Sequence, residues 1–239
     1  MKTPLAIYRR ELAAFFHSAL AYIALPLFWF LIGLFSLYLD DLFDKGLAHM
    51  GSVFRWIALF MVLLVPALTM RTLAEERRSG SLELLQTLPV SDGQIVLGKF
   101  LAVLTVVWVG LAFTLIYPIT LSQVGELDWG PVLGGYLGLG MMAAAYCAIG
   151  IAVSAFTKSQ ILAFLVSMVL CLVPYATGFF LEQVPASWLP IVQQLSFDFH
   201  LSSLSRGVLD SRNLVFYFSV VLVALHVAVF ALEERRLRA

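Results

Sequence analysis

Long runs of residues without charge constrain this chain more than any other feature of its sequence. A helix needs about 20 apolar residues to cross roughly 30 Å of hydrocarbon. Five uncharged runs meet that length: Leu12–Leu39, Phe100–Gly125, Trp129–Thr157, Ser159–Leu181 and Asn213–Leu232. Only 13% of the 239 residues are charged, against roughly 25% in soluble domains. The chain therefore has too few polar side chains to cover a soluble globule, and we predict an all-α polytopic membrane protein.

A sixth crossing is less regular. Its uncharged part, Trp56–Met70, has 15 residues, which gives only about 22 Å of helix. The apolar residues 50–54 extend it if Arg55 snorkels to the headgroups. We therefore predict six crossings. A re-entrant second segment would instead give five and would place the two termini on opposite sides.

The sequence divides into an N-terminal interfacial helix, six transmembrane spans and two distinctive connecting segments. The interfacial helix is predicted over 3–17, a polar segment over 75–90 and an outer segment over 182–212. The six spans are predicted over 19–39, 51–73, 96–122, 131–156, 160–181 and 213–232. The alternative for the first range is a frayed start of the first span. The outer segment is rich in apolar residues, so we expect short helices that dip into or lie on the membrane face. Pro118 and Pro174 should each kink a span or free a carbonyl group.

The basic residues are distributed unequally between the two sides of this arrangement. The larger group of eleven comprises Lys2, Arg9, Arg10, Arg71, Arg77, Arg78, Lys99, Lys158, Arg235, Arg236 and Arg238. The smaller group of four comprises Lys45, Arg55, Arg206 and Arg212. Cytoplasmic segments carry the excess of Lys and Arg. Both termini and the polar segment are therefore predicted to face the cytoplasm.

Small residues form two series with four-residue spacing in the fourth predicted span. They are Gly134, Gly138, Gly140, Ala144, Ala148 and Ala152. In lipid, this spacing lets two helices approach closely. The pattern is compatible with packing inside the chain and with a contact between two subunits.

A few residues inside or beside the spans could carry chemistry. His226 is the one ionisable residue deep in a span, and such groups are functional candidates. The structural alternative is a neutral histidine that is hydrogen-bonded between helices. We expect His200 to be isolated on the outer side. Cys147 and Cys171 lie in apolar runs, so we expect buried thiols rather than a disulfide.

No catalytic or nucleotide-binding motif is recognisable in the sequence. Residues 93–99 match the first seven positions of a phosphate-binding loop, but Phe100 stands where Ser or Thr must ligate magnesium. We therefore predict that the chain is not an enzyme and binds neither cofactor nor metal, and that Lys99 anchors the third span at the inner headgroups. An ion-coupled carrier is disfavoured because the spans have no charged centre and no clear repeat. The zero net charge argues against nucleic acid as a partner.

The polar segment after the second span has clear start and stop signals. Thr72 and Glu75 have the spacing of a capping box, and Pro89 ends the helical pattern. Ser91 and Gln94 form a second capping box that begins the third span. The sequence thus predicts a short helix joined directly to that span, so a force on it would reach the membrane.

The residues of this segment resemble a known signature. Residues 75–91 read Glu-Glu-Arg-Arg-Ser-Gly-Ser-Leu-Glu-Leu-Leu-Gln-Thr-Leu-Pro-Val-Ser. This run resembles the segment between the second and third spans of ABC-2 type permeases, the membrane subunits of a large class of ABC exporters. The resemblance extends over the whole chain and implies an ABC-2 (type V exporter-like) permease fold. The run from His200 to Asp210 is similar to the branch associated with gliding motility and copper-enzyme maturation.

The resemblance implies that the segment contains a coupling helix that docks on a nucleotide-binding subunit. The implied docking face is Glu75, Glu76, Arg77 and Arg78, the middle of the coupling element is Leu82, Glu83 and Leu85, and its end and the start of the next span are Pro89 and Ser91. The family's partners would be two ABC ATPase subunits that carry ATP and Mg²⁺, a second permease copy and a periplasmic accessory subunit.

The implied function is to couple ATP hydrolysis by a separate subunit to substrate movement, in the export direction, in a bacterial cytoplasmic membrane. The alternative is a mechanotransmission complex that acts on a periplasmic partner through the outer segment and moves no cargo.

Overall fold

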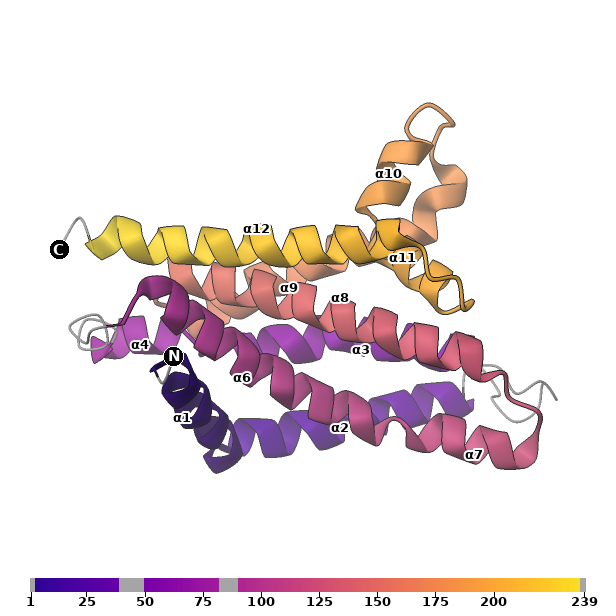
Figure 1. Ribbon diagram of the computed structural model, residues 1–239, viewed down its shortest axis with the longest axis horizontal. Coiled ribbons are helices and arrows are strands. Elements are labelled where there is room, and N and C mark those ends of the chain that lie inside the picture. The colour runs from indigo at the N-terminus through magenta and orange to yellow at the C-terminus, as the bar shows by residue number, and fades with distance from the viewer. Residues whose placement is uncertain (1–2, 39–49, 82–89, 237–239) are drawn as a thin grey trace.

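The computed structural model describes residues 3–38, 50–81 and 90–236, and these ranges are almost entirely helical. The elements are α1 Thr3–His17, α2 Ala19–Tyr38, α3 Gly51–Thr69, α4 Ala74–Ser79, α6 Asp92–Phe113, α7 Ile116–Val124, α8 Trp129–Phe156, α9 Gln160–Ala176, the 3₁₀-helix η1 Thr177–Gln183, α10 Leu189–Leu195, α11 Phe197–Leu204 and α12 Ser211–Arg236. They form an elongated bundle in which the long helices run side by side (Figure 1).

Six segments within the described ranges are long and apolar enough to cross a membrane. They are Ala19–Tyr38, Gly51–Ser79, Asp92–Gln123, Trp129–Phe156, Gln160–Leu181 and Ser211–Glu234. The prediction of six crossings is therefore confirmed at the level of length and composition. The second crossing begins at Gly51, so the apolar residues before Arg55 do extend it.

The arrangement of the termini follows from the even number of crossings. The start of α1 and the end of α12 lie at the same end of the bundle as α4 (Figure 1). We call this the α4 end. The α10 end is the opposite one, where α10 and η1 stand away from the long helices.

The helix α1 is separate from the first span. The two helices meet at Ser18, where the backbone N–H and the hydroxyl both donate to the Phe15 carbonyl, at 3.2 and 3.0 Å. In Figure 1 α1 runs obliquely to α2. It packs mainly against α6. The structure thus shows α1 as a helix of its own rather than as the first turns of α2, and its location at the membrane interface stays a prediction.

The central element of the bundle is α8, which packs against α3, α6, α9, α11 and α12. Its glycines allow these close approaches. A Cβ atom added to Gly134 would collide with the Leu204 carbonyl oxygen, and one added to Gly138 would lie 2.9 Å from a Leu201 methyl carbon. Both contacts are with α11. The backbone of α8 can therefore lie directly against the outer helices only because these positions lack a side chain.

The rest of the small-residue series also packs inside the chain. A Cβ atom on Gly140 would lie 2.8 Å from the Trp108 ring of α6. Ala144 is half-buried against the core, and Ala148 and Ala152 belong to the core itself. Packing within one chain accounts for the series, and no second subunit is needed to explain it.

Two prolines interrupt spans near the end of the bundle opposite α4. The helix α6 ends at Phe113, and α7 begins three residues later at Ile116, just before Pro118. A proline cannot donate to the carbonyl four residues earlier, which is that of Thr114. The helix α9 contains Pro174 and gives way to η1 at Thr177. The expected interruptions are thus present.

The outer segment contains η1, α10 and α11, and it is fixed by a histidine. The expectation that His200 is isolated is wrong, because its side chain is buried. Its Nδ1 lies 2.7 Å from Asn213 Oδ1 in α12, and its Nε2 lies 3.1 Å from the Gln194 carbonyl oxygen in α10. The ring also stacks on Phe216 with centroids 4.1 Å apart. One side chain thus ties α10, α11 and α12 together.

The remaining residues of interest are placed more simply. His226 is exposed on α12 and forms no hydrogen bond with another residue that the structure describes, so its role and a hydrogen bond to a neighbouring helix stay predictions. Cys147 and Cys171 are buried free thiols, as predicted.

The packing of α8 predicts the effect of adding a single methyl group. The variant Gly134→Ala forces α11 away from α8, which should reduce the free energy of unfolding by about 1–3 kcal/mol. The matched control is Gly93→Ala in α6, where an added Cβ would have no neighbour within 4 Å. Denaturant unfolding of the purified protein in detergent checks both, and equal stability of the two variants would contradict the packing described here.

Candidate functional site

The short helix α4 follows directly on the turn that ends α3. The predicted capping box between Thr72 and Glu75 is wrong, because no side chain caps this helix. The Thr72 hydroxyl instead donates to the Thr69 carbonyl at 2.7 Å and lies 3.0 Å from Ser154 Oγ in α8. The helix ends at Gly80, whose φ of 76° is the left-handed conformation favoured by glycine. Turn chemistry at both ends therefore fixes α4 as a single short helix.

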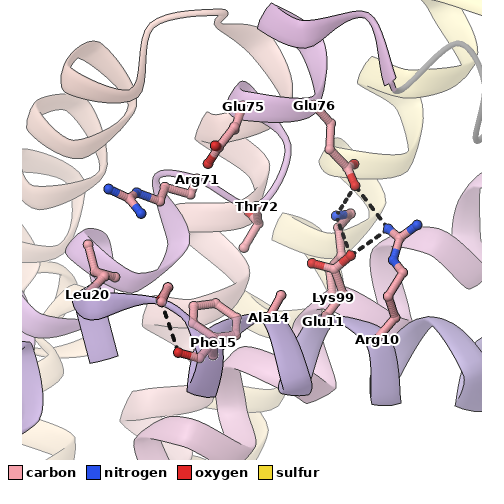
Figure 2. Close-up of a pocket in the computed structure, with 11 residues that line it drawn as sticks. Arg10, Glu11, Ala14, Phe15, Leu20, Arg71, Thr72, Glu75, Glu76 and Lys99 are labelled. Atoms are coloured by element: carbon pink, nitrogen blue, oxygen red, sulfur yellow. Dashed lines mark hydrogen bonds and ion pairs between the residues drawn. The ribbon is translucent and has the colours of Figure 1, made fainter. Parts of the chain in front are cut away.

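Four charged side chains meet where α4, α1 and α6 approach one another (Figure 2). Lys99 of α6 is at the centre, with its Nζ 2.9 Å from Glu76 Oε1 and 3.2 Å from Glu11 Oε1. Arg10 contacts the same two oxygens through its Nη2, at 3.1 Å and 2.7 Å respectively. We call these four residues the junction cluster. Its two positive and two negative charges balance, and each carboxylate contacts both cations.

The burial of Lys99 makes this cluster more than a surface ion pair. Its side chain is only 1% exposed, so the prediction of a headgroup anchor is wrong. An ammonium group loses several kcal/mol of hydration when it is buried, and opposite charges must compensate for that loss. Glu76 and Glu11 are themselves only 16% and 13% exposed. The position of α4 therefore depends on α6 through a poorly hydrated ion pair.

Arg10 forms the exposed edge of the cluster. Burial lowers the pKa of its guanidinium, but the hydrogen bonds and charges of Glu11 and Glu76 outweigh that effect and leave the pKa raised. A second polar contact holds the same helix, since the Tyr8 hydroxyl lies 3.2 Å from Thr105 Oγ1 of α6. Together these contacts fix α1 along α6.

A cavity of about 430 Å³ opens beside the cluster, between α1 and the turn from α3 to α4. Arg71, Thr72 and Glu75 line its other side in Figure 2. This space separates much of α4 from α1. The two helices are thus held together by charges at one edge of the cavity rather than by continuous apolar packing.

Arg77 points to the other side of α4. Its side chain is buried, and its Nη1 donates to the carbonyl oxygen of Ala155. The helix α8 ends at Phe156, so this carbonyl is among the last four that have no partner inside the helix. A positive charge is also favourable at a helix C-terminus. Arg77 therefore fastens α4 to the end of the central helix.

Two of the four charged residues of α4 lie on its surface. Glu75 and Arg78 are exposed, whereas Glu76 and Arg77 are bonded within the chain. The four residues that the resemblance assigns to docking thus separate into two that a partner can reach and two that hold α4 in place. Their docking role stays a prediction.

The start of the next span agrees with the sequence. The Ser91 side chain accepts from the Gln94 backbone N–H, and the Gln94 side chain accepts from that of Ser91. The predicted capping box at the head of α6 is confirmed. The other residues assigned to the coupling element lie outside the described residues: Leu82, Glu83, Leu85 and Pro89.

Sequence reasoning missed three members of the junction cluster, namely Arg10, Glu11 and Lys99. One signal was available. Lys99 shares a helical stripe with Val96 and Val103, which are buried. A cation on a buried stripe requires an acidic partner, although the pattern does not say which one.

These observations define a class: a helical, multi-pass membrane protein with a short charged helix that is tied to two of its long helices. Comparison with protein families agrees, since the model described as ABC-2 family transporter protein matches residues 6–205. This range covers most of the chain, which therefore belongs to the ABC-2 transporter family and is a membrane permease component of an ABC transporter. No curated protein matches the sequence.

The contrast between Arg77 and Arg78 gives a matched test of the site. Arg77→Met leaves the Ala155 carbonyl without its donor in a buried place, which should reduce the free energy of unfolding by about 1–3 kcal/mol. Arg78→Met removes a neighbouring exposed charge and should change it by less than about 0.5 kcal/mol. Denaturant unfolding in detergent measures both. If the two variants lose the same stability, Arg77 does not cap α8.

Proposed function

We propose that this chain transmits the ATP-driven movement of a separate ABC ATPase subunit into its own membrane helices, and so drives export of a substrate. The ATPase would dock on α4 and carry the ATP and Mg²⁺. Both termini and the α4 end would face the cytoplasm of a bacterial inner membrane. The excess of basic residues at this end supports that orientation.

The observation that carries the proposal is the division of α4 into two faces. Glu75 and Arg78 are exposed to a partner, while Glu76 and Arg77 bind α6 and α8. A partner that displaces α4 therefore acts directly on one span through Lys99 and on the central helix through Ala155. The ATPase can shift the permease between two states only if it contacts α4 differently in each.

The packing of the bundle supports a complex that contains two permease copies. The interior around α8 is filled by side chains, whereas α9 and α12 expose many large apolar residues along their length. Among the residues that the structure describes, one chain has no wide passage through this filled interior. We propose that two permease copies, identical or closely related, form the pathway and that each binds one ATPase subunit.

The α10 end favours a second candidate function. The helix α10 has no buried residues, and Trp188, Ile191 and Leu195 are each more than half exposed. A periplasmic protein that binds this surface could receive mechanical force instead of cargo. In that case the complex would act on its partner without moving a substrate, and a reconstituted complex that accumulates a defined substrate in vesicles would contradict this version.

Charge reversal on the exposed face of α4 tests the docking proposal. The double variant Glu75→Arg/Arg78→Glu keeps the net charge and spares the junction cluster. It should weaken association with the ATPase subunit about tenfold or more, because like charges would then face each other across the interface. The measurement is the Kd between the purified permease in nanodiscs and its ATPase, identified by co-purification from the native host.

The control exchanges two other charges at the same end of the bundle. Arg9→Glu/Glu233→Arg also preserves the net charge, and both side chains are exposed and outside α4. This variant should bind the ATPase as tightly as the unaltered protein. Equal affinities for the two double variants would rule out α4 as the docking site.

A further inference from the structure

A small polar pocket lies at the α10 end, between the first turns of α3 and one face of α11. Its volume is about 260 Å³, less than the roughly 300–1,000 Å³ of pockets that hold drug-sized ligands. Its polar lining consists of Ser52, Arg55, Asp198, Ser202, Ser205 and Arg206. The junction cluster and α4 are at the other end of the bundle, so the proposed coupling function does not use this pocket.

One side of the pocket offers donors. Arg55 and Arg206 are both exposed, and neither forms a salt bridge with a described residue. A guanidinium group has five N–H donors in a planar fork that matches the oxygens of a phosphate. Two guanidinium groups on one small pocket therefore favour a ligand with a phosphate group.

The other side offers acceptors. Asp198 and Ser202 lie on α11, and Ser205 follows at its C-terminal cap. The two serine hydroxyls donate to the carbonyls of Phe199 and Ser202. Their oxygen lone pairs remain free to accept. Burial raises the pKa of Asp198, and the charge of Arg55 offsets only part of that effect. A ligand ammonium group would stabilise this carboxylate and would donate to the serine oxygens.

The depth of the pocket points to a lipid. Arg55 and Arg71 lie on the same crossing, sixteen residues apart, which is about 24 Å of helix. That distance approaches the roughly 30 Å thickness of the hydrocarbon core. With Arg71 near one boundary, Arg55 lies near the headgroups of the opposite leaflet.

We propose that this pocket binds the headgroup of a phosphatidylethanolamine molecule from the leaflet at the α10 end. Arg55 and Arg206 bind its phosphate, and Asp198 with the serine oxygens accepts from its primary ammonium group. The occupant spans α3 and α11 and so fastens the outer helices to the second crossing.

Native mass spectrometry of the delipidated protein in detergent tests the site. Phosphatidylethanolamine, phosphatidylcholine and phosphatidylglycerol with identical acyl chains are titrated separately. The ethanolamine lipid should bind about tenfold more tightly than the other two, because choline cannot donate a hydrogen bond and glycerol has no positive charge. Equal affinities for all three lipids would overturn the proposal.

Variants locate the binding to the pocket. Arg55→Gln/Arg206→Gln should weaken phosphatidylethanolamine binding about tenfold or more, whereas Arg212→Gln, an exposed arginine outside the pocket, should leave it unchanged. Asp198→Asn should abolish the preference for ethanolamine over glycerol, and this result still decides the matter if the double variant fails to fold. An unaltered preference in Asp198→Asn would contradict the assignment.

A soluble headgroup distinguishes a lipid from a free phosphate compound. Glycerophosphoethanolamine carries the same phosphate and ammonium groups without acyl chains. It should bind far more weakly than the lipid, since it has no acyl chains to bury against the apolar surface of the protein. Equal affinity for the two would show that the ligand is a soluble phosphate compound and would overturn the lipid assignment.

Discussion

The ion pair between Lys99 and Glu76 is the interaction on which the organisation of the α4 end depends. A lysine that is 1% exposed on a membrane span must be compensated by opposite charge. Its two carboxylates come from different helices, α1 and α4, so one buried ammonium group holds three elements together. The same requirement explains why α1 lies along α6 instead of continuing straight into the first span. The short helix α4 is thus coupled to the bundle by electrostatics, in a place where apolar packing is interrupted by a cavity.

Packing around α8 determines which other helices a displacement of α4 would affect. Arg77 connects α4 to the end of α8, and α8 contacts five other helices. Its glycines bring α11 into direct contact at the far end, through Gly134 and Gly138. A close-packed interior has few intermediate positions and responds to displacement as a unit. The central helix therefore provides a continuous mechanical connection between the α4 end and the α10 end.

The sequence predicted those features that depend on local chemistry. Five uncharged runs and a shorter one extended past Arg55 identified the six crossings, and the Ser91–Gln94 capping box identified the start of α6. The sequence did not reveal which side chains of α4 face inward, because a helix of six residues has no apolar periodicity that would fix its orientation. Nor could it pair Lys99 with Glu11 or His200 with Asn213. Those contacts join residues on different elements, and only the folded bundle brings them together.

The most direct test of the account is a double-mutant cycle on Glu76 and Lys99. The free energy of unfolding is measured in detergent for Glu76→Gln, Lys99→Met, the double variant and the unaltered protein. If the two side chains form a buried pair, each single variant leaves the cluster with one uncompensated charge. The double variant should then lose less unfolding free energy than the two single variants lose together, by about 1–3 kcal/mol. Single effects that add to within about 0.5 kcal/mol would contradict the account, because α4 would then not be tied to α6 through this pair.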